Sequence, residues 1–203
     1  MITKPVGSAI RTYTGILFDF ENPEKSPISI EDIAHSLSLL CRFAGHCKSF
    51  YSVAEHSIRV SHICPPEHAL WGLMHDAGEC YCVDVPRPLK YLAGMEAYRA
   101  HEKRVMKAIC KWFNMDPVEP PSVKVADNIM LVTEQRDLLK NSIPDFDITP
   151  LADTIFPWDS IFAKYAFISR FNQLTERTTP SNVNSTEHLD PGQGWFPGRT
   201  DRT

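Results

Sequence analysis

The chain has 203 residues, and its hydrophobic content of 43% is ample for the core of one folded domain. Its formal net charge of −4 argues against a nucleic-acid polymer as partner, since binding a phosphate backbone requires a basic face. A small phosphate ester is compatible with this charge, because a few local cations suffice to bind it.

The cysteines and the hydropathy pattern predict a reduced, cytoplasmic chain. None of the six cysteines forms a C-x-x-C pair, and several fall on apolar helical faces. The sequence contains no signal peptide and no membrane-length apolar run. We therefore expect no membrane partner and a cytoplasmic location, which is the host cytoplasm if the chain is phage-encoded. A zinc–cysteine site is the alternative use of these thiols.

The first element is expected near the N-terminus, where residues 11–28 are rich in β-branched, aromatic and turn residues. They predict a short strand or hairpin, followed by a loop that begins at Asn22. Ser29 with Asp32 then predicts the capped start of a helix that runs to about Phe43. The apolar stripe that this helix would bury consists of Ile30, Ile33, Leu37 and Leu40.

Two neighbouring helices are expected next. Ser52 and Glu55 form an S-x-x-E capping box, which predicts that a helix starts at Val53. The following helix is expected to open at Pro66, because proline suits the first helical position. The short connection from His62 onward makes the two helices antiparallel neighbours. The predicted buried face of the second helix consists of Ala69, Leu70, Leu73, Met74 and Ala77.

The second half of the chain predicts three longer helices. The first covers residues 95–114 and ends before the prolines at 117, 120 and 121, which cannot continue a helix. The second runs from about 122 to 141, and the third from about 157 to 176 after a loop at 142–156. Their predicted apolar positions are Val105, Ala108, Ile109 and Trp112, then Val125, Ile129, Val132 and Leu139, then Ile161, Tyr165, Ile168 and Phe171.

Charge and composition predict an exposed face and a C-terminal tail. Glu134, Arg136 and Asp137 are interpreted as an exposed charged face. After Arg177 the composition shifts to Thr, Ser, Asn, Pro and Gly, so residues 177–203 are expected to be a flexible or surface-draped tail. Residues 1–176 then form one domain, an all-α compact bundle of about six main helices with a short N-terminal strand or hairpin. Candidate anchors for the tail are Trp195 and Phe196.

Imidazole and carboxylate groups at four positions suggest a divalent metal site. His56 falls near the start of its predicted helix, and the pair His75-Asp76 falls on the next helix. Asp127, in the sequence KVADN, offers a fourth ligand. By itself a His-Asp dipeptide is a common chance event. Glu79 lies four residues after His75, which places both on one face of an uninterrupted helix.

Several motifs strengthen the metal-site interpretation. The run H-D-A-x-E-x-x-x-x-D-x-P-x-P-x-K is present from His75 to Lys90. It is preceded by Arg42-Phe43 and by V-x-E-H ending at His56, and it is followed by K-x-x-D ending at Asp127. This pattern resembles the HD-domain phosphohydrolase superfamily, and within it the bacterial 5'-deoxynucleotidases and the phage deoxyadenosine triphosphate triphosphohydrolases. The resemblance spans roughly residues 32–139.

The resemblance implies an HD-domain fold and a role for each matching residue. The metal ligands would be His56, His75, Asp76 and Asp127, and the catalytic residues would be Asp76, Glu79 and Lys90. Glu79 would act as general acid or base. The substrate-binding residues would be Arg42, Phe43, Gly45, His46, Asp84, Lys90 and Lys124.

Four of these substrate contacts have specific expected roles. Phe43 stands where the relatives carry a tryptophan that would stack on the base. Asp84 would lie near the sugar 3'-hydroxyl and disfavour a 2'-hydroxyl. Gly45 replaces a bulky aliphatic residue that helps the phage enzyme to exclude a 2-amino purine, so guanine stays an alternative base. His46 would contact phosphate, contribute to the metal shell or make a structural hydrogen bond.

The function implied by the resemblance is the metal-dependent hydrolysis of 2'-deoxynucleotide phosphates, most of all those of deoxyadenosine. The cofactor would be Co²⁺, Mn²⁺, Zn²⁺ or Mg²⁺, the partner a small nucleotide, and the assembly a homo-oligomer, either a dimer or a hexamer. A 5'-deoxynucleotidase of broad base specificity is the alternative, and the sequence leaves mono- and triphosphate substrates open. A catalytically crippled nucleotide-binding regulator and a di-iron oxygenase of the same superfamily are alternatives of other classes.

Overall fold

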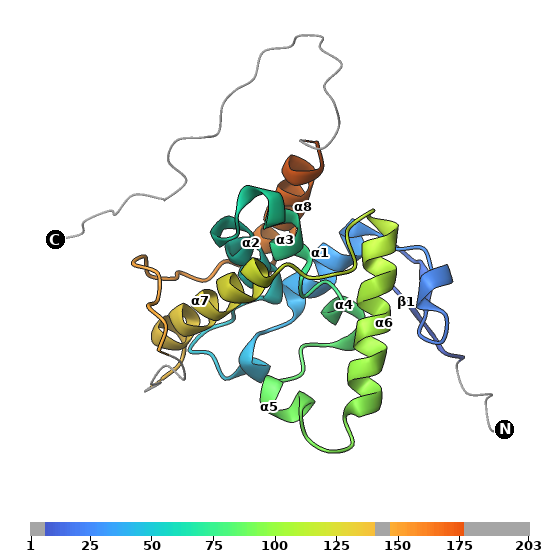
Figure 1. The fold of residues 1–203 in the computed structure, drawn as a ribbon, viewed down its shortest axis with the longest axis horizontal. Helices are drawn as coiled ribbons and strands as arrows, with labels where there is room; N and C mark the ends of the chain where they lie inside the picture. The colour runs from blue at the N-terminus through green and yellow to red at the C-terminus, as the bar shows by residue number, and fades with distance from the viewer. Residues whose placement is uncertain (1–6, 141–146, 177–203) are drawn as a thin grey trace, which may run out of the picture.

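Helices dominate the fold, which a computed structural model describes for residues 7–140 and 147–176. Figure 1 shows α1, α2, α3 and α8 gathered on one side, with α6 and α7 as two separate long helices that flank the short α5. This arrangement confirms the prediction of an all-α fold with a short N-terminal hairpin. The elements are β1 (Ala9–Arg11), β2 (Leu17–Asp19), α1 (Ile30–Leu39), α2 (Val53–Ile63), α3 (Ala69–Met74), α4 (Glu79–Cys82), α5 (Arg87–Lys90), α6 (Glu96–Trp112), α7 (Pro121–Leu138) and α8 (Ser160–Glu176).

The N-terminal hairpin is tied to α1 by a buried carboxylate. Strands β1 and β2 pair antiparallel, with Ile10 opposite Phe18. Asp32 accepts hydrogen bonds from the amide of Thr14 at 2.7 Å and from its hydroxyl at 2.8 Å. The predicted cap at Ser29 is present, since its hydroxyl accepts from the amide of Glu31 at 3.2 Å. Asp32 therefore anchors the hairpin and takes no part in a capping box.

Helix α1 ends four residues earlier than predicted. Leu40 adopts an extended conformation, and its carbonyl accepts from the amide of Val53 at 3.0 Å. Cys41 and Ser52 form an isolated antiparallel bridge. Because these extended residues satisfy their backbone groups against the start of α2, the helix does not continue to Phe43. Arg42 and Phe43 consequently lie in a loop.

Helices α2 and α3 pack closely against each other, as the short connection between them predicted. The Ser52 hydroxyl accepts from the Glu55 amide at 3.1 Å, which confirms both the cap and the start of α2 at Val53. At Gly72 a Cβ atom would come within 2.6 Å of Cys64 Sγ and 3.0 Å of the Ser61 backbone. Glycine is therefore required for this approach of the two helices.

The helix expected from Pro66 is divided into shorter pieces, and the prediction of one continuous helix is wrong. A 3₁₀ turn over Pro66–His68 precedes α3, and residues 75–78 form a turn between α3 and α4. In this turn the amide of Ala77 bonds to the carbonyl of Met74 at 2.9 Å. Such i→i+3 bonds tighten the backbone. His75 and Glu79 hence do not share the face of one regular α-helix.

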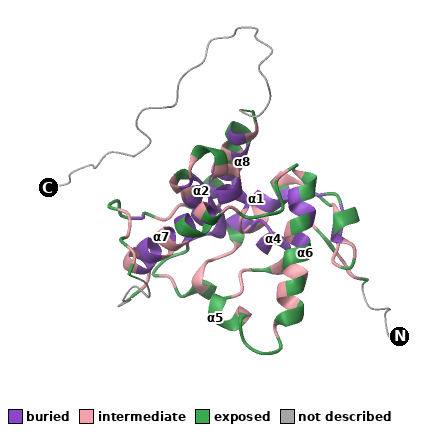
Figure 2. Cartoon of the chain, in the orientation of Figure 1, coloured by how far each residue is buried: buried purple, intermediate pink, exposed green. Residues whose placement is uncertain are grey.

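Two apolar clusters form the core. The larger one joins β2, α1, α2, α3 and α8, and Figure 2 shows buried residues concentrated where α1, α2 and α8 meet. The smaller cluster joins α2, α3 and α7 through Val60, Trp71, Ala126 and Met130. Four positions predicted to be apolar contacts are instead exposed: Trp112, Val125, Ile161 and Tyr165. Their helices form as predicted, but each lies on the outer side of its helix.

Parts of the predicted C-terminal half lie outside the described residues. These are the first residues of the expected loop, 142–146, and the tail 177–203 with Trp195 and Phe196. The six cysteines are all described, and all are free thiols. None of the helices formed by residues 7–140 and 147–176 combines the length and apolar character needed to cross a bilayer.

Candidate metal centre

Three side chains from two neighbouring helical segments converge at one point of the fold. His56 lies in the first turn of α2, while His75 and Asp76 lie in the turn after α3. The two histidine Nε2 atoms are 3.3 Å apart. Asp76 Oδ2 lies 3.3 Å from His75 Nε2 and 3.6 Å from His56 Nε2. One ligand atom from each residue fits within a span of 4.8 Å, which is the spacing of a group able to hold a metal ion.

Asp127 approaches this group from α7. Its Oδ1 atom lies 3.4 Å from His56 Nε2. Its Oδ2 atom accepts from Lys124 at 2.5 Å and from Arg87 at 3.2 Å. The structure thus brings all four predicted ligands together, although Asp127 contacts the group through His56 and is partly committed to two cations.

The hydrogen bonds at the Nδ1 atoms fix how the two imidazoles face each other. His75 Nδ1 lies 2.8 Å from the carbonyl oxygen of Gly72, which can only accept, so this nitrogen carries a proton. His56 Nδ1 lies 2.7 Å from Glu134 Oε1. Because Glu134 is ionised, this oxygen can only accept, so His56 Nδ1 also carries a proton. In the neutral form of each ring, Nε2 then presents a lone pair to the centre.

Glu134 is the site residue that the sequence analysis missed. We predicted it on an exposed charged face, but its side chain is completely buried. Its second oxygen accepts from Nε and Nη2 of Arg42, both at 3.1 Å. Burial would raise the pKa of this carboxyl, yet Arg42 and His56 lower it below its ordinary value. Glu134 follows Asp127 by two helical turns, so the spacing from a predicted ligand is the signal that identifies it.

The chemistry of this donor set fits a divalent cation. Two facing lone pairs and a carboxylate oxygen repel one another unless a proton or a metal ion lies between them. Burial disfavours a charged His75, but Asp76 outweighs burial and raises the pKa of this imidazole to about 9. The negative charge of Asp76, which retains this proton, would also attract a metal ion. A carboxylate behind a ligating histidine, as Glu134 lies behind His56, is the usual second layer of such sites.

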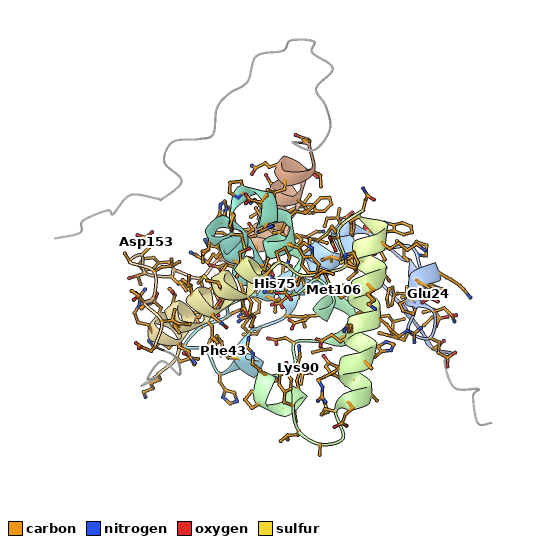
Figure 3. All side chains as sticks on the ribbon, viewed as in Figure 1. Glu24, Phe43, His75, Lys90, Met106 and Asp153 are labelled. Atoms are coloured by element: carbon orange, nitrogen blue, oxygen red, sulfur yellow. The ribbon has the colours of Figure 1, made fainter. Side chains whose placement is uncertain are left out.

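A cavity of about 700 Å³ opens beside the group. His75 and Asp76 line it together with Glu79, Lys90 and part of α6, and Figure 3 shows His75 near the middle of the molecule with Met106 and Lys90 around it. This volume is typical of small-molecule sites.

Two predicted catalytic residues lie in the cavity wall as a pair. Glu79 Oε1 accepts from Lys90 Nζ at 3.4 Å, and Lys90 also donates to Glu102 at 2.6 Å. The other oxygen, Glu79 Oε2, is buried and has no hydrogen-bond partner among the described residues. Burial raises the pKa of the Glu79 carboxyl well above its ordinary value, and Asp76 and Asp84 raise it further. Glu79 is therefore a candidate for proton transfer in the cavity wall.

Comparison with known proteins places the chain in a family. No protein-family model matches it. An uncharacterized protein of Escherichia coli strain K12, YfdR, is 40% identical over 177 residues, which are 83% of this chain and 97% of YfdR. The chain belongs to the YfdR family. An uncharacterized protein of Rhodobacter capsulatus is 33% identical over 125 residues, 57% of this chain and 63% of the relative.

The remaining predicted substrate-binding residues of this YfdR-family chain include Arg42, Asp84 and Lys124, and each interacts with a charged side chain. Arg42 reaches Asp76 at 3.5 Å through Nη1. Burial opposes its charge, but Glu134 and Asp76 raise the pKa of the guanidinium above its ordinary value. Asp84 follows α4, and burial raises the pKa of its carboxyl although Arg42 lowers it. Lys124 is engaged with Asp127.

The loop after Arg42 is not brought into the cavity. Phe43 and Ala44 adopt positive φ values of 55° and 50°. The Arg42 guanidinium lies 5.5 Å from the centre of the Phe43 ring. Gly45 has φ of 82°, and a Cβ there would meet nothing within 4 Å. His46 is exposed. In this member of the YfdR family, Phe43, Gly45 and His46 lie outside the described cavity lining.

Proposed function

We propose that this protein is an HD-type metal-dependent phosphohydrolase that acts on 2'-deoxynucleotides, with deoxyadenosine phosphates as the first candidate substrates. The observation that carries the proposal is the cluster of His56, His75 and Asp76, whose ligand atoms lie within 4.8 Å of one another. Two of its members, His75 and Asp76, line a cavity. Asp127 and Glu79 beside this cluster complete the set of residues that such hydrolysis requires.

The four ligand residues would hold one divalent ion. His56 and His75 would donate through Nε2, and Asp76 and Asp127 through carboxylate oxygens. A bound divalent ion lowers the pKa of water and polarises a phosphoryl oxygen. Glu134 keeps the His56 ring in the tautomer and orientation that donation requires, through the bond of 2.7 Å to Nδ1.

Glu79 would handle the proton of the attacking water or of the leaving group. Its raised pKa favours the protonated carboxyl more than in an ordinary glutamate, which suits a group that transfers protons. The Oε2 atom, which has no hydrogen-bond partner among the described residues, would be the one that carries the proton. Lys90, which holds the other oxygen, fixes the orientation of the carboxylate.

Arg42 and Lys90 would balance phosphate charge. Arg42 contacts Asp76 and Glu134, so its cation is fixed beside the ligands without reorganisation. Lys90 would exchange part of its contact with Glu102 for a phosphate oxygen. The roles of Phe43 and Gly45 at the base, of Asp84 at the sugar, and of His46 and Lys124 at the phosphates rest on the resemblance to HD-domain phosphohydrolases alone.

A broad 5'-deoxynucleotidase acting on monophosphates is the second candidate within this class. A crippled nucleotide-binding regulator would be free to lose the acid–base residue. The buried Glu79 facing the cavity favours the enzyme over that regulator. Homo-oligomer formation and a cytoplasmic location stay predictions.

The direct test is hydrolysis by the metal-stripped protein after addition of Co²⁺, Mn²⁺, Mg²⁺ or Zn²⁺ to a panel of deoxy- and ribonucleotides, with products separated by chromatography. We expect at least one deoxynucleotide to be cleaved in a metal-dependent way and its ribonucleotide counterpart to react more slowly. Absence of cleavage with every metal would refute the proposal.

Two variants separate metal binding from chemistry. His75→Ala should lose both metal and turnover. Glu79→Gln should retain metal and lose turnover by about 10²–10⁴-fold, the range for removal of a general acid or base. Loss of metal in Glu79→Gln would instead make Glu79 a ligand.

A further inference from the structure

Helix α6 carries four cations in one column. Arg99, Lys103, Lys107 and Lys111 follow one another at intervals of four residues, which places them on one side of the helix. Arg99, Lys103 and Lys107 line the cavity that contains the metal group, whereas Lys111 lies beyond its lining. Like charges at this spacing repel each other, so the column lowers the stability of an isolated helix.

Two of the four lysine and arginine side chains that line the cavity are already engaged. Lys90 pairs with Glu79 and Glu102. Arg99 donates to the carbonyl of Lys90 and pairs with Glu96. Lys103 and Lys107 are different, because neither forms an ion pair with any residue that the structure describes. Two unneutralised ammonium groups thus lie one helical turn apart in the wall of a cavity that also contains His75 and Asp76.

Two cations that are unpaired among the described residues, on one side of the cavity, suit an extended anion as their ligand. The lining also includes the carboxylates of Asp76, Glu79, Glu102 and Glu119, of which Glu79 and Glu102 pair with Lys90. Pro117, Val118 and Glu119 also line the cavity, and only Glu119 among them carries a charge. The Cα atoms of Lys103 and Lys107 are about 6 Å apart along the helix axis, given a rise of 1.5 Å per residue. A single phosphate held by His75 and Asp76 would occupy only that end of the cavity. A chain of linked phosphates is longer and could also contact Lys103 and Lys107, which line the same cavity.

We propose that Lys103 and Lys107 form a subsite for the phosphates of a polyphosphate chain that extend beyond the reacting phosphate. This proposal rests on the proposed function and narrows it, because it assigns the protein a nucleoside triphosphate as substrate in preference to a monophosphate. The ligand chemistry recognised at the subsite is that of linked phosphates, independent of base and sugar.

The first test uses inorganic tripolyphosphate without added divalent metal, so that binding reports on α6 and not on the metal group. Isothermal titration compares the unmodified chain, the double variant Lys103→Gln/Lys107→Gln and the control Lys111→Gln. Loss of charge-assisted contacts should weaken binding about tenfold or more in the double variant. The control should bind like the unmodified chain, because Lys111 is in the same column but outside the cavity lining.

Two outcomes would overturn the subsite. One is the absence of tripolyphosphate binding to the unmodified chain. The other is an equal loss in the double variant and in Lys111→Gln, which would show a general effect of charge. Both lysines are exposed, and thermal unfolding of each variant checks that the fold is intact.

The second test uses kinetics and separates this proposal from the proposed function. In the metal-loaded protein, the double variant should raise KM for deoxyadenosine triphosphate about tenfold while KM for the monophosphate is unchanged. Triphosphate hydrolysis with unchanged KM would refute the subsite and leave the proposed function intact. Tripolyphosphate binding that depends on Lys103 and Lys107, without hydrolysis of any nucleotide, would refute the function and leave the subsite intact.

Discussion

At the scale of single residues, Glu134 connects the predicted ligand His56 to the cation Arg42. Its carboxylate holds His56 through one oxygen and Arg42 through the other, and Arg42 in turn reaches Asp76. A buried carboxylate is costly unless all its oxygens are satisfied. Glu134 meets this condition only when both His56 and Arg42 are in place. It therefore links the orientation of the His56 ring to the position of Asp76.

Replacement of Glu134 by glutamine tests this link. The amide has nearly the same shape but no charge, so His56 loses the anion that orients its ring and raises its basicity. We expect metal affinity to fall about 10–100-fold, the usual effect of removing such a partner. Titration with Co²⁺, followed by visible absorption, measures the change. Glu31→Gln, which removes only the outlying contact with Lys164, is the matched control. Unchanged affinity in Glu134→Gln would contradict the role.

The protonation of His75 predicts how metal binding depends on pH. Its pKa is raised to about 9, so at neutral pH the metal-free imidazole carries a second proton, on Nε2, besides the one on Nδ1. That proton must leave before Nε2 can donate to a metal. Metal affinity should therefore fall as pH decreases below about 9, and metal uptake at pH 7 should release protons. Calorimetric titrations in two buffers of different ionisation enthalpy measure this release, and an absence of release would refute the prediction.

At the scale of elements, capping signals located the starts of α1 and α2 better than the apolar pattern located the end of α1. The hydroxyl of Ser52 was sufficient to locate the first turn of α2, because a cap acts within three residues. The end of α1 depends on the bridge between Cys41 and Ser52, which is a contact between separate segments. The same limit explains Glu134, since a charged run reads as solvent-exposed until the partners Arg42 and His56 are known.

The close packing of α2 and α3 predicts a sharp effect of a small substitution. Gly72→Ala would place its Cβ 2.6 Å from Cys64 Sγ and 3.0 Å from the backbone of Ser61. Overpacking of this kind destabilises by about 1–3 kcal/mol. Urea unfolding measures the loss, with Gly7→Ala as control because a Cβ there meets nothing within 4 Å. Equal stability of the two variants would contradict the close approach.

At the scale of the whole molecule, two apolar clusters hold the segments of the site together. The larger apolar cluster holds α2 and α3 against α1 and α8. The smaller cluster holds α7 against α2 and α3, so that Asp127 and Glu134 lie next to His56. The resemblance stated which residues should meet, but only the packing of these clusters explains why they do. The column of lysines on α6 was not identified from the sequence, because the cavity that it faces is formed by residues from separate segments.

In the proposed function, side chains from three segments bind one divalent ion. Anomalous diffraction from crystals grown with Mn²⁺ or Co²⁺ tests this claim most directly. We predict one anomalous peak between the Nε2 atoms of His56 and His75 and the carboxylate of Asp76, with Asp127 turned toward it, and no peak there in crystals of His75→Ala. A metal bound elsewhere on the chain, with this position lacking anomalous signal, would contradict the account.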